Sequence, residues 1–327
     1  MLPVNDVKLC YAQISRLVDI KSPALNARVK TLLNKKELSK GCAGKRIYLN
    51  PQQIKTVIHD RVNDLNGKII YIGNLKGGVG KTALAYLLTE VLSTLGLKTC
   101  AIDLDVQSNL TRQFIEIGVE QPVFSDVIDK KLVIEDIIIT ISPTLDLIPS
   151  SLKNGLIQKT LSVQTPKHYL TWFNILCLNY LRSKYDVIIV DTPPSLTTLN
   201  SVFSLCLKNN DNLVIPVCAD EFSIMGINMF LEDVNSIRDS YNVKSNPKIS
   251  IIMNKFFQNQ TNNLDVLAKI NKEYKDIFSK NIIRDSAKIR EIINNKVRIG
   301  NVKQNKELFE ILAELLKEFN ILKKIVA

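Results

Sequence analysis

A glycine-rich stretch between Tyr71 and Leu88 carries the residues that could do chemistry. Its core reads KGGVGKT over residues 76–82 and stands between a short apolar run and a segment with apolar residues at helical spacing. In that context glycines let backbone N–H groups converge on phosphate oxygens, and the start of the helix adds the positive end of its dipole. The pattern predicts a phosphate-binding loop made by Gly77, Gly78, Val79, Gly80, Lys81, Thr82 and Ala83.

Two side chains at the end of this loop have distinct predicted tasks. Lys81 should reach the β- and γ-phosphates of a nucleoside triphosphate, and Thr82 should place its hydroxyl on Mg²⁺. Leu75 stands where the general pattern has glycine, and a second lysine, Lys76, precedes the paired glycines. A cation at that position could offset the negative charge of two nucleotides that face each other across a dimer. A solvated loop lysine is the alternative for Lys76.

Three aspartates end two apolar runs that read as strands. Asp191 closes VIIVD, whereas Asp103 and Asp105 close AIDLD. Parallel strands present their carboxyl ends at one edge of the sheet, where ligands bind, so we expect these carboxylates beside the phosphate loop. Asp191 would hold Mg²⁺ through water, with Asp103 and Thr82 nearby. Alternation places Asp103 and Asp105 on one face of the strand, and one of them can orient an attacking water.

The elements that must position these side chains alternate along the chain. Apolar runs that predict strands cover residues 68–73, 98–105, 186–195, 212–219 and 248–256. Helical spacing occurs at residues 82–96, 168–183, 195–208, 226–241 and 262–276. This alternation indicates an α/β fold of the P-loop NTPase kind over residues 66–327, with a mostly parallel sheet covered by helices on both faces. The last helical pattern, 304–323, should pack its apolar stripe on that sheet.

Residues 1–65 follow a different pattern, with several short helices and no series of strands. Ser22-Pro23 and Asn50-Pro51 each resemble an N-cap followed by proline at the first helical position. The segment from Tyr11 to Leu33 reads helix, short turn, helix, and the next residues resemble a wing followed by a helix. A winged helix-turn-helix-like DNA-binding domain is one interpretation, and a small helical dimerisation module is the other. On the first interpretation the residues that contact DNA are Ser22, Asn26, Arg28 and Lys30.

The net charge of +11 is unevenly distributed. Residues 1–65 hold 12 Lys and Arg against 5 Asp and Glu, and residues 251–327 hold 15 against 9, while the centre is slightly acidic. Basic ends favour a polyanionic partner, with nucleic acid first and an anionic membrane second. The alternative is a solvated surface. In the C-terminal region the predicted DNA-binding residues are Arg284, Lys288, Arg290 and Arg298.

Four motifs carry a resemblance to a known family. KGGVGKT (76–82), DLDVQSNLT (103–111), DTPPS (191–195) and IIMNKF (251–256) together resemble the ParA family of DNA-partition ATPases. This family belongs to the deviant Walker A ATPases, which also include MinD-type proteins. The resemblance implies ATP and Mg²⁺ as cofactors, slow ATP hydrolysis, an ATP-dependent homodimer, non-specific DNA binding, a ParB-like partner and a cytoplasmic, nucleoid-associated location. Larger plasmid members carry an N-terminal operator-binding domain, which would make this chain an autorepressor.

The resemblance also implies roles for single residues. Lys76 matches the signature lysine that crosses the dimer interface to the partner's nucleotide. Asp105 matches the carboxylate that positions the attacking water, and Gln107 and Asn109 fall in a switch loop that senses the γ-phosphate. Asn254 matches an asparagine that recognises adenine, with a strand-end turn residue as the alternative. Glu221 lies in a loop that usually lines the dimer interface.

A MinD-like, membrane-associated positioning ATPase is the alternative function. The last residues, FNILKKIVA (319–327), combine apolar side chains with two lysines, as a membrane-binding helix would. They continue a helix whose apolar side should be packed, so no membrane partner is expected. No run of about 18 uncharged apolar residues occurs, and this excludes a transmembrane helix.

Overall fold

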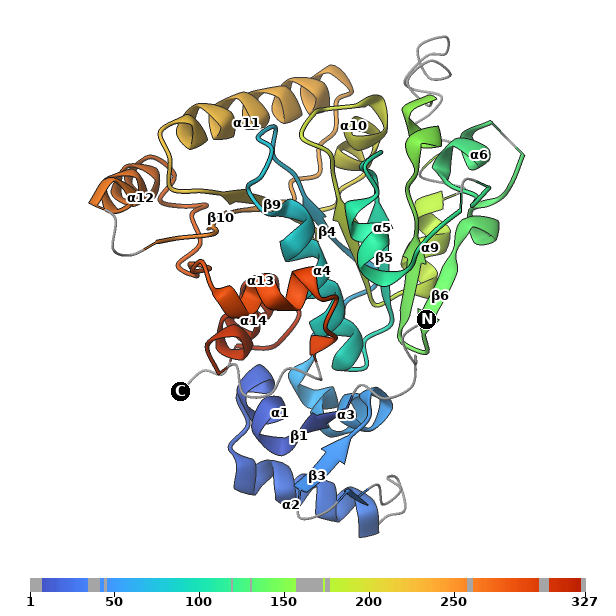
Figure 1. Ribbon diagram of the computed structural model, residues 1–327, viewed down its shortest axis with the longest axis vertical. Helices are drawn as coiled ribbons and strands as arrows, with labels where there is room; N and C mark the ends of the chain where they lie inside the picture. Colours follow the sequence, from blue (N-terminus) through green and yellow to red (C-terminus); the bar gives the residue numbers. More distant parts are fainter. Residues whose placement is uncertain are drawn as a thin grey trace.

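A seven-stranded sheet forms the centre of the computed structural model (Figure 1). The structure describes residues 8–34, 42–43, 46–118, 120–129, 131–156, 173, 177–257, 261–299 and 306–324. The strand order is β10-β9-β4-β8-β5-β7-β6, in which the β6–β7 pair alone is antiparallel. The strands are β4 (Lys68–Ile72), β5 (Thr99–Asp103), β6 (Ile139–Ser142), β7 (Leu145–Ile148), β8 (Val187–Asp191), β9 (Asn212–Val217) and β10 (Lys248–Met253). The predicted mostly parallel α/β sheet is confirmed.

Alternate side chains of the central strands supply two hydrophobic cores, one on each face of the sheet. On β4, Ile70 and Ile72 join one core, and Ile69 and Tyr71 join the other. Because both faces are covered, β4, β5 and β8 are buried at every position. The helices of the body are α4 (Lys81–Thr94), α5 (Asn109–Phe114), α6 (Phe124–Ile128), α9 (Asn179–Lys184), α10 (Thr198–Leu205), α11 (Phe222–Ser240), α12 (Thr261–Glu273), α13 (Ala287–Asn294) and α14 (Lys306–Glu318), with short 3₁₀ turns η2 (Ile134–Ile137) and η3 (Leu152–Leu156).

The sequence patterns missed one feature of the body. The β6–β7 hairpin extends the sheet beyond β5 and was not predicted. The predicted helix at 168–183 lies largely outside the described residues, and α9 forms its last part.

The described residues between 8 and 61, which we call the N-terminal module, form a small unit at the foot of the molecule (Figure 1). Its elements are β1 (Leu9–Cys10), α1 (Tyr11–Val18), α2 (Ser22–Asn34), β2 (Cys42–Ala43), β3 (Arg46–Leu49), α3 (Pro51–Ile58) and the 3₁₀ turn η1 (His59–Arg61). The strands form an antiparallel sheet of order β1-β3-β2. As predicted, Asn50 caps α3, because its side chain accepts a 2.9 Å hydrogen bond from the Gln53 N–H. The expected succession of two helices, a β-prone run and a third helix is present, β1 and the sheet that it forms with β3 were not predicted, and the winged-helix interpretation stays a prediction.

The apolar side of α14 was expected to pack on the sheet. Helix α14 lies beside α1 (Figure 1), and its buried side chains share one core both with α1 and with sheet residues such as Ile72 and Ile252. Leu312 and Leu316 of α14 share one core with Ile14 and Leu17 of α1. Past α14, the apolar residues Phe319, Ile321 and Leu322 are also buried. These side chains therefore offer no face to a membrane, and no helix of the described residues is long and apolar enough to span one.

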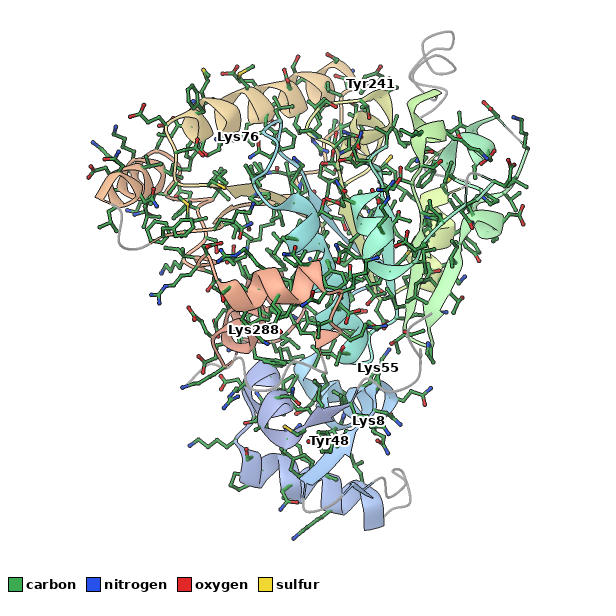
Figure 2. All side chains as sticks on the ribbon, in the orientation of Figure 1. Lys8, Tyr48, Lys55, Lys76, Tyr241 and Lys288 are labelled. Atoms are coloured by element: carbon green, nitrogen blue, oxygen red, sulfur yellow. The ribbon has the colours of Figure 1, made fainter. Side chains whose placement is uncertain are left out.

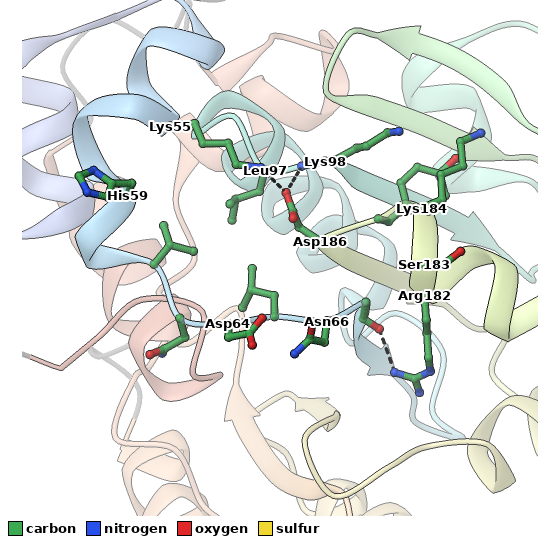
Figure 3. A pocket seen from close by; sticks show the side chains of 15 residues that line it. Lys55, His59, Asp64, Asn66, Leu97, Lys98, Arg182, Ser183, Lys184 and Asp186 are labelled. Atoms are coloured by element: carbon green, nitrogen blue, oxygen red, sulfur yellow. Dashed lines mark hydrogen bonds and ion pairs between the residues drawn. The ribbon is translucent and has the colours of Figure 1, made fainter. Parts of the chain in front are cut away.

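Close contacts join the N-terminal module to the body. Gly96, which follows α4, has φ +82°, and a Cβ there would lie 2.1 Å from the Pro51 carbonyl oxygen. Nearby, the ammonium of Lys55 lies 2.8 Å from the Asp186 carboxylate, and both residues line a cavity of about 560 Å³ (Figure 3). The Lys323 N–H also donates to the Arg61 carbonyl at 2.8 Å. The module is thus docked on the edge of the sheet where the strands begin.

Candidate nucleotide site

The loop between β4 and α4 has the backbone that a phosphate ligand needs. Gly78 and Gly80 have φ of +75° and +89°, in the left-handed region that glycine adopts without steric cost. A Cβ on Gly77 or Gly78 would meet nothing within 4 Å, so this part of the loop faces open space. A Cβ on Gly80 would lie 2.2 Å from the side-chain nitrogen of Asn254. The loop is therefore open where a ligand would enter and tightly packed where α4 begins.

Lys81 lies inside this loop, as predicted. Its ammonium donates to the carbonyl oxygens of Asn74 and Lys76, at 3.0 and 2.9 Å. Burial lowers the pKa of Lys81, and the nearby Asp191 and Asp105 partly offset that effect. Among the described residues Lys81 forms no ion pair, so its charge is available to an anion placed on the loop.

Asp191 is a buried carboxylate without ordinary partners. It is fully buried at the end of β8, and among the described residues neither of its oxygens completes a hydrogen bond of ordinary geometry. Burial first, and the charge of Asp103 second, raise the pKa of Asp191 well above its usual range, while the Thr82 hydroxyl and Lys81 lower it. An orphaned carboxylate is costly unless a ligand compensates it.

These groups fit Mg²⁺ bound together with a nucleotide. The described residues contain no group of three or more His, Cys, Asp or Glu side chains able to hold a metal. A cation beside Asp191 and Thr82 would therefore take further oxygens from phosphate and water, which is how proteins usually bind Mg²⁺.

Asp103 and Asp105 hold the loop that follows β5. Asp103 accepts hydrogen bonds from the N–H and the hydroxyl of Thr111, both at 2.8 Å, and from the Asp105 N–H at 3.0 Å. Burial raises the pKa of Asp103 to about 6. These contacts favour a loop-anchoring role over the predicted metal role. Asp105 accepts from the Gln107 N–H at 3.0 Å through one carboxylate oxygen.

Asn254 lies at the phosphate loop, but its amide is already engaged. Its side-chain nitrogen donates to the Val79 carbonyl at 2.8 Å, and its oxygen accepts from the Lys255 N–H at 3.0 Å. Recognition of adenine by Asn254 stays a prediction. The ammonium of Lys255 donates to the Gly78 carbonyl at 2.8 Å, a contact that sequence reasoning missed. The sequence signal for this contact was that Lys255 directly follows the predicted site residue Asn254.

Lys76 lies beside the start of α11, at the end of the molecule opposite the N-terminal module (Figure 2). Its ammonium forms an ion pair with Asp220 and stands 6.0 Å from the centre of the Phe222 ring. The side chains of Lys76 and Asp220 are about one-third exposed, at 31% and 37%. Sequence reasoning named the neighbouring Glu221 and missed Asp220, which is 144 positions from Lys76 in the chain.

Comparison with known proteins identifies the family. The AAA domain family (AAA_31) matches residues 67–251, which is more than half of the chain. The sporulation initiation inhibitor protein Soj of Bacillus subtilis is 30% identical over 230 residues, which cover 69% of this chain and 87% of Soj. The chain belongs to the ParA family of P-loop ATPases. The roles of Lys76, Lys81 and Asp191 in an ATPase site stay predictions.

Solved structures agree with this membership. A plasmid partition protein of Borrelia burgdorferi bound to AMPPNP is 26% identical, with a TM-score of 0.60 over 77% of this chain and 99% of that one. McdA of Cyanothece in its ATP complex is 22% identical, with a TM-score of 0.67 over 80% of this chain and 99% of McdA. At that identity the McdA comparison shows the fold alone.

Two of the predicted DNA-binding arginines of this ParA-family chain have structural partners. The Arg28 guanidinium makes two hydrogen bonds to Asp60, at 2.6 and 2.8 Å, and a third to the Val57 carbonyl at 3.3 Å. It therefore ties α2 to the end of α3. Arg298 lies 2.7 Å from the carboxylate of Glu90, which is fully buried in α4. Both contacts favour structural roles over the predicted contact with DNA.

The other predicted contacts lie at the surface. Around α13, the ion pairs Arg284–Glu307, Lys288–Glu291 and Arg290–Asp285 involve basic side chains that are 42–58% exposed. The Arg284–Glu307 and Lys288–Glu291 pairs are exposed on both sides, so they contribute little and exchange easily for another anion, whereas Asp285 is only 11% exposed. On α2, Ser22 and Lys30 are exposed, and Asn26 is half-buried.

Proposed function

We propose that this ParA-type partition ATPase works as an ATP-driven dimer switch that binds DNA without sequence preference. The observation that carries the proposal is the orphaned, fully buried Asp191 beside Lys81 and the open glycine loop. A buried charge arranged in this way suits a site whose ligand completes it. A ParB-like partner would stimulate hydrolysis, as the family resemblance implies. The partition role is supported by the plasmid partition protein of Borrelia burgdorferi.

The residues around the loop would divide the work of hydrolysis. Bound Mg²⁺ neutralises charge on the β- and γ-phosphates of ATP. Thr82 and Asp191 would hold the cation, and Lys81 would exchange its two carbonyl partners for phosphate oxygens. Asp105 would orient the attacking water with the carboxylate oxygen that does not bind Gln107. Slow intrinsic turnover is expected, because no further general base contacts Asp105 among the described residues.

Lys76 would connect two copies of the chain. Two triphosphates that face each other concentrate negative charge, and a lysine from each neighbour offsets it. In the single chain the same ammonium is held by Asp220, so dimer formation would replace that carboxylate with the partner's phosphates. Because both side chains of the pair are about one-third exposed, the exchange should cost little free energy.

DNA would bind at the exposed basic side chains around α13. Arg284 and Lys288 can leave their exposed acidic partners for phosphate groups, and the exposed guanidinium of Arg290 would add a third contact. Binding of this kind releases counterions, so affinity should fall steeply as salt rises. The N-terminal module would add an operator contact through exposed residues of α2 such as Ser22 and Lys30.

Filter retention of duplex DNA tests the switch. Wild-type protein is compared with Lys81→Ala, with ATP, with ADP and without nucleotide, over a series of salt concentrations. We expect retention to require ATP, to fall with salt and to be lost in Lys81→Ala. Lys131→Ala, which removes a charge from an exposed 3.4 Å pair far from the loop, is the control and should behave as wild type. Equal retention in all nucleotide states would refute the switch.

A further inference from the structure

Helix α4 makes hydrogen bonds and an ion pair to the segment that follows the basic helix α13. Tyr86 and Glu90 lie one turn apart on α4, so their side chains share a face. The Tyr86 hydroxyl donates to the Val297 carbonyl at 3.2 Å. The Glu90 carboxylate lies 2.7 and 2.9 Å from the Arg298 Nε and accepts from the Ile299 N–H at 3.1 Å. Residues 297–299 are therefore fixed to the helix that begins at the phosphate loop.

The ion pair of Glu90 with Arg298 would be costly to break, because the Glu90 carboxylate is buried. Glu90 is fully buried, and burial raises its pKa while Arg298 and the Ile299 N–H lower it. A buried carboxylate that loses its cation is left uncompensated, which is strongly unfavourable. Residues 297–299 must consequently follow any displacement of α4.

Helix α5 and the residues that follow it contact Tyr86 and Lys296, the residue just before that segment. The ring of Phe114 lies 5.3 Å from the ring of Tyr86, and the Lys296 ammonium lies 2.9 Å from the Glu116 carboxylate. Earlier in α5, Thr111 binds Asp103 with both its N–H and its hydroxyl. Contacts therefore run without a break from the acidic strand end of the nucleotide site to the residues after α13, which lies beside α4 (Figure 1).

We infer that Tyr86 and Glu90 are positioning residues that couple the nucleotide loops to the basic helix α13. This inference rests on the proposed ATP-dependent DNA binding and names the route of its regulation. When the loop of residues 105–109 rearranges around the nucleotide, α5 moves against Tyr86 and Lys296. The segment after α13 moves with them, and Lys288 and Arg290 change their place relative to DNA.

The test compares DNA affinity in two nucleotide states. Dissociation constants for a labelled duplex are measured by fluorescence anisotropy with a non-hydrolysable ATP analogue and with ADP, and their ratio is taken. Tyr86→Phe removes the hydroxyl and keeps the ring, and Glu90→Gln removes the charge and keeps the shape. We expect each change to reduce the ratio at least five-fold while affinity for the analogue changes less than two-fold. Thr89→Val is the control on the same helix, because the Thr89 hydroxyl is buried without a partner.

The possible outcomes distinguish a failure of the coupling from a failure of the proposed ATP-dependent DNA binding. A ratio near one in the wild type overturns both the switch and the coupling. A large wild-type ratio that survives in Tyr86→Phe and Glu90→Gln overturns the coupling alone.

The exposed ion pair Glu116–Lys296 allows a second test if the Glu90→Gln variant does not fold. Glu116→Lys should reduce the ratio two- to three-fold, and adding Lys296→Glu should restore it, since the exposed pair is re-formed with its charges exchanged. Failure of the second change to restore the ratio contradicts the inference.

Discussion

Buried carboxylates at the two edges of the central sheet differ in their hydrogen bonding. At the edge where the strands begin, Asp211 has four donors: two guanidinium nitrogens of Arg182, at 2.6 and 3.0 Å, and the N–H groups of Ile69 and Lys208, at 2.8 and 2.6 Å. At the edge where the strands end, Asp191 is as deeply buried, yet it completes no ordinary hydrogen bond.

This difference separates a structural charge from a functional one. Asp211 joins α9, β4 and the start of β9, so its partners are parts of the fold. Asp191 stands among Lys81, Thr82 and the glycine loop, so the partner that would complete it comes from outside the chain. Buried charged groups without hydrogen-bond partners are concentrated at functional sites, where they lower the stability of the unliganded protein and favour ligand binding. Substitution at the two edges should therefore have effects of opposite sign.

The largest effect is expected at the satisfied edge. Asp211→Ala leaves the guanidinium of Arg182 buried without its partner, since that side chain is 9% exposed. The free energy of unfolding should fall by about 3–5 kcal/mol. Urea unfolding followed by circular dichroism measures the change, with the exposed Asp239→Ala as control. A loss of less than about 1 kcal/mol would contradict the distinction between a structural charge at Asp211 and a functional one at Asp191.

A second change tests how tightly the N-terminal module is docked at that edge. Gly96→Ala forces a left-handed backbone on alanine and places its Cβ against the Pro51 carbonyl. We expect a loss of about 1–3 kcal/mol in the free energy of unfolding. Gly118→Ala adds the same methyl group where nothing lies within 4 Å and is the control. Equal stability of the two variants would mean that the module is loosely held.

At the unsatisfied edge the sign should reverse. Asp191→Asn replaces a buried carboxylate whose oxygens complete no ordinary hydrogen bond among the described residues, so the nucleotide-free protein should gain about 1–2 kcal/mol of stability. The same change should abolish Mg²⁺-dependent ATP hydrolysis, because the cation loses a ligand. Unfolding in urea and phosphate release measure the two effects. Destabilisation comparable to that of Asp211→Ala would show that Asp191 is a structural charge.

The smallest effect is a dependence on pH. Because folding raises the pKa of Asp103 from 3.8 to about 6, the folded state binds a proton first. This group therefore makes the nucleotide-free protein more stable as pH falls from about 7 to about 5, by on the order of 1 kcal/mol. Asp103→Asn should remove that component, which is read from the difference between the two unfolding curves. A difference that does not change with pH would exclude a raised pKa.

Local spacing was enough to predict the nucleotide site. Lys81, Thr82 and the glycines are consecutive, and Asp191 ends an apolar run, so strand direction alone brings these groups to one edge. Partners distant in the chain could not be predicted. The ion pair of Lys76 with Asp220 and that of Arg298 with Glu90 depend on how separate elements pack.

The same limit applies to whole elements. The apolar stripe of α14 showed that one side is buried but not that α1 covers it. The short β6–β7 hairpin lies at the edge of the sheet, where the pattern of buried strands no longer applies.

The mass of the protein in solution tests the central claim most directly. Light scattering is recorded with Mg²⁺ and a non-hydrolysable ATP analogue for wild type, Lys76→Ala and the control Lys131→Ala. Wild type and the control should double in mass when the analogue is added, whereas Lys76→Ala should bind the analogue and remain a single chain. Asp220→Asn, which frees Lys76, should dimerise at a two- to five-fold lower protein concentration. Dimers of Lys76→Ala that form as readily as those of wild type would contradict the proposed ATP-bridged pair.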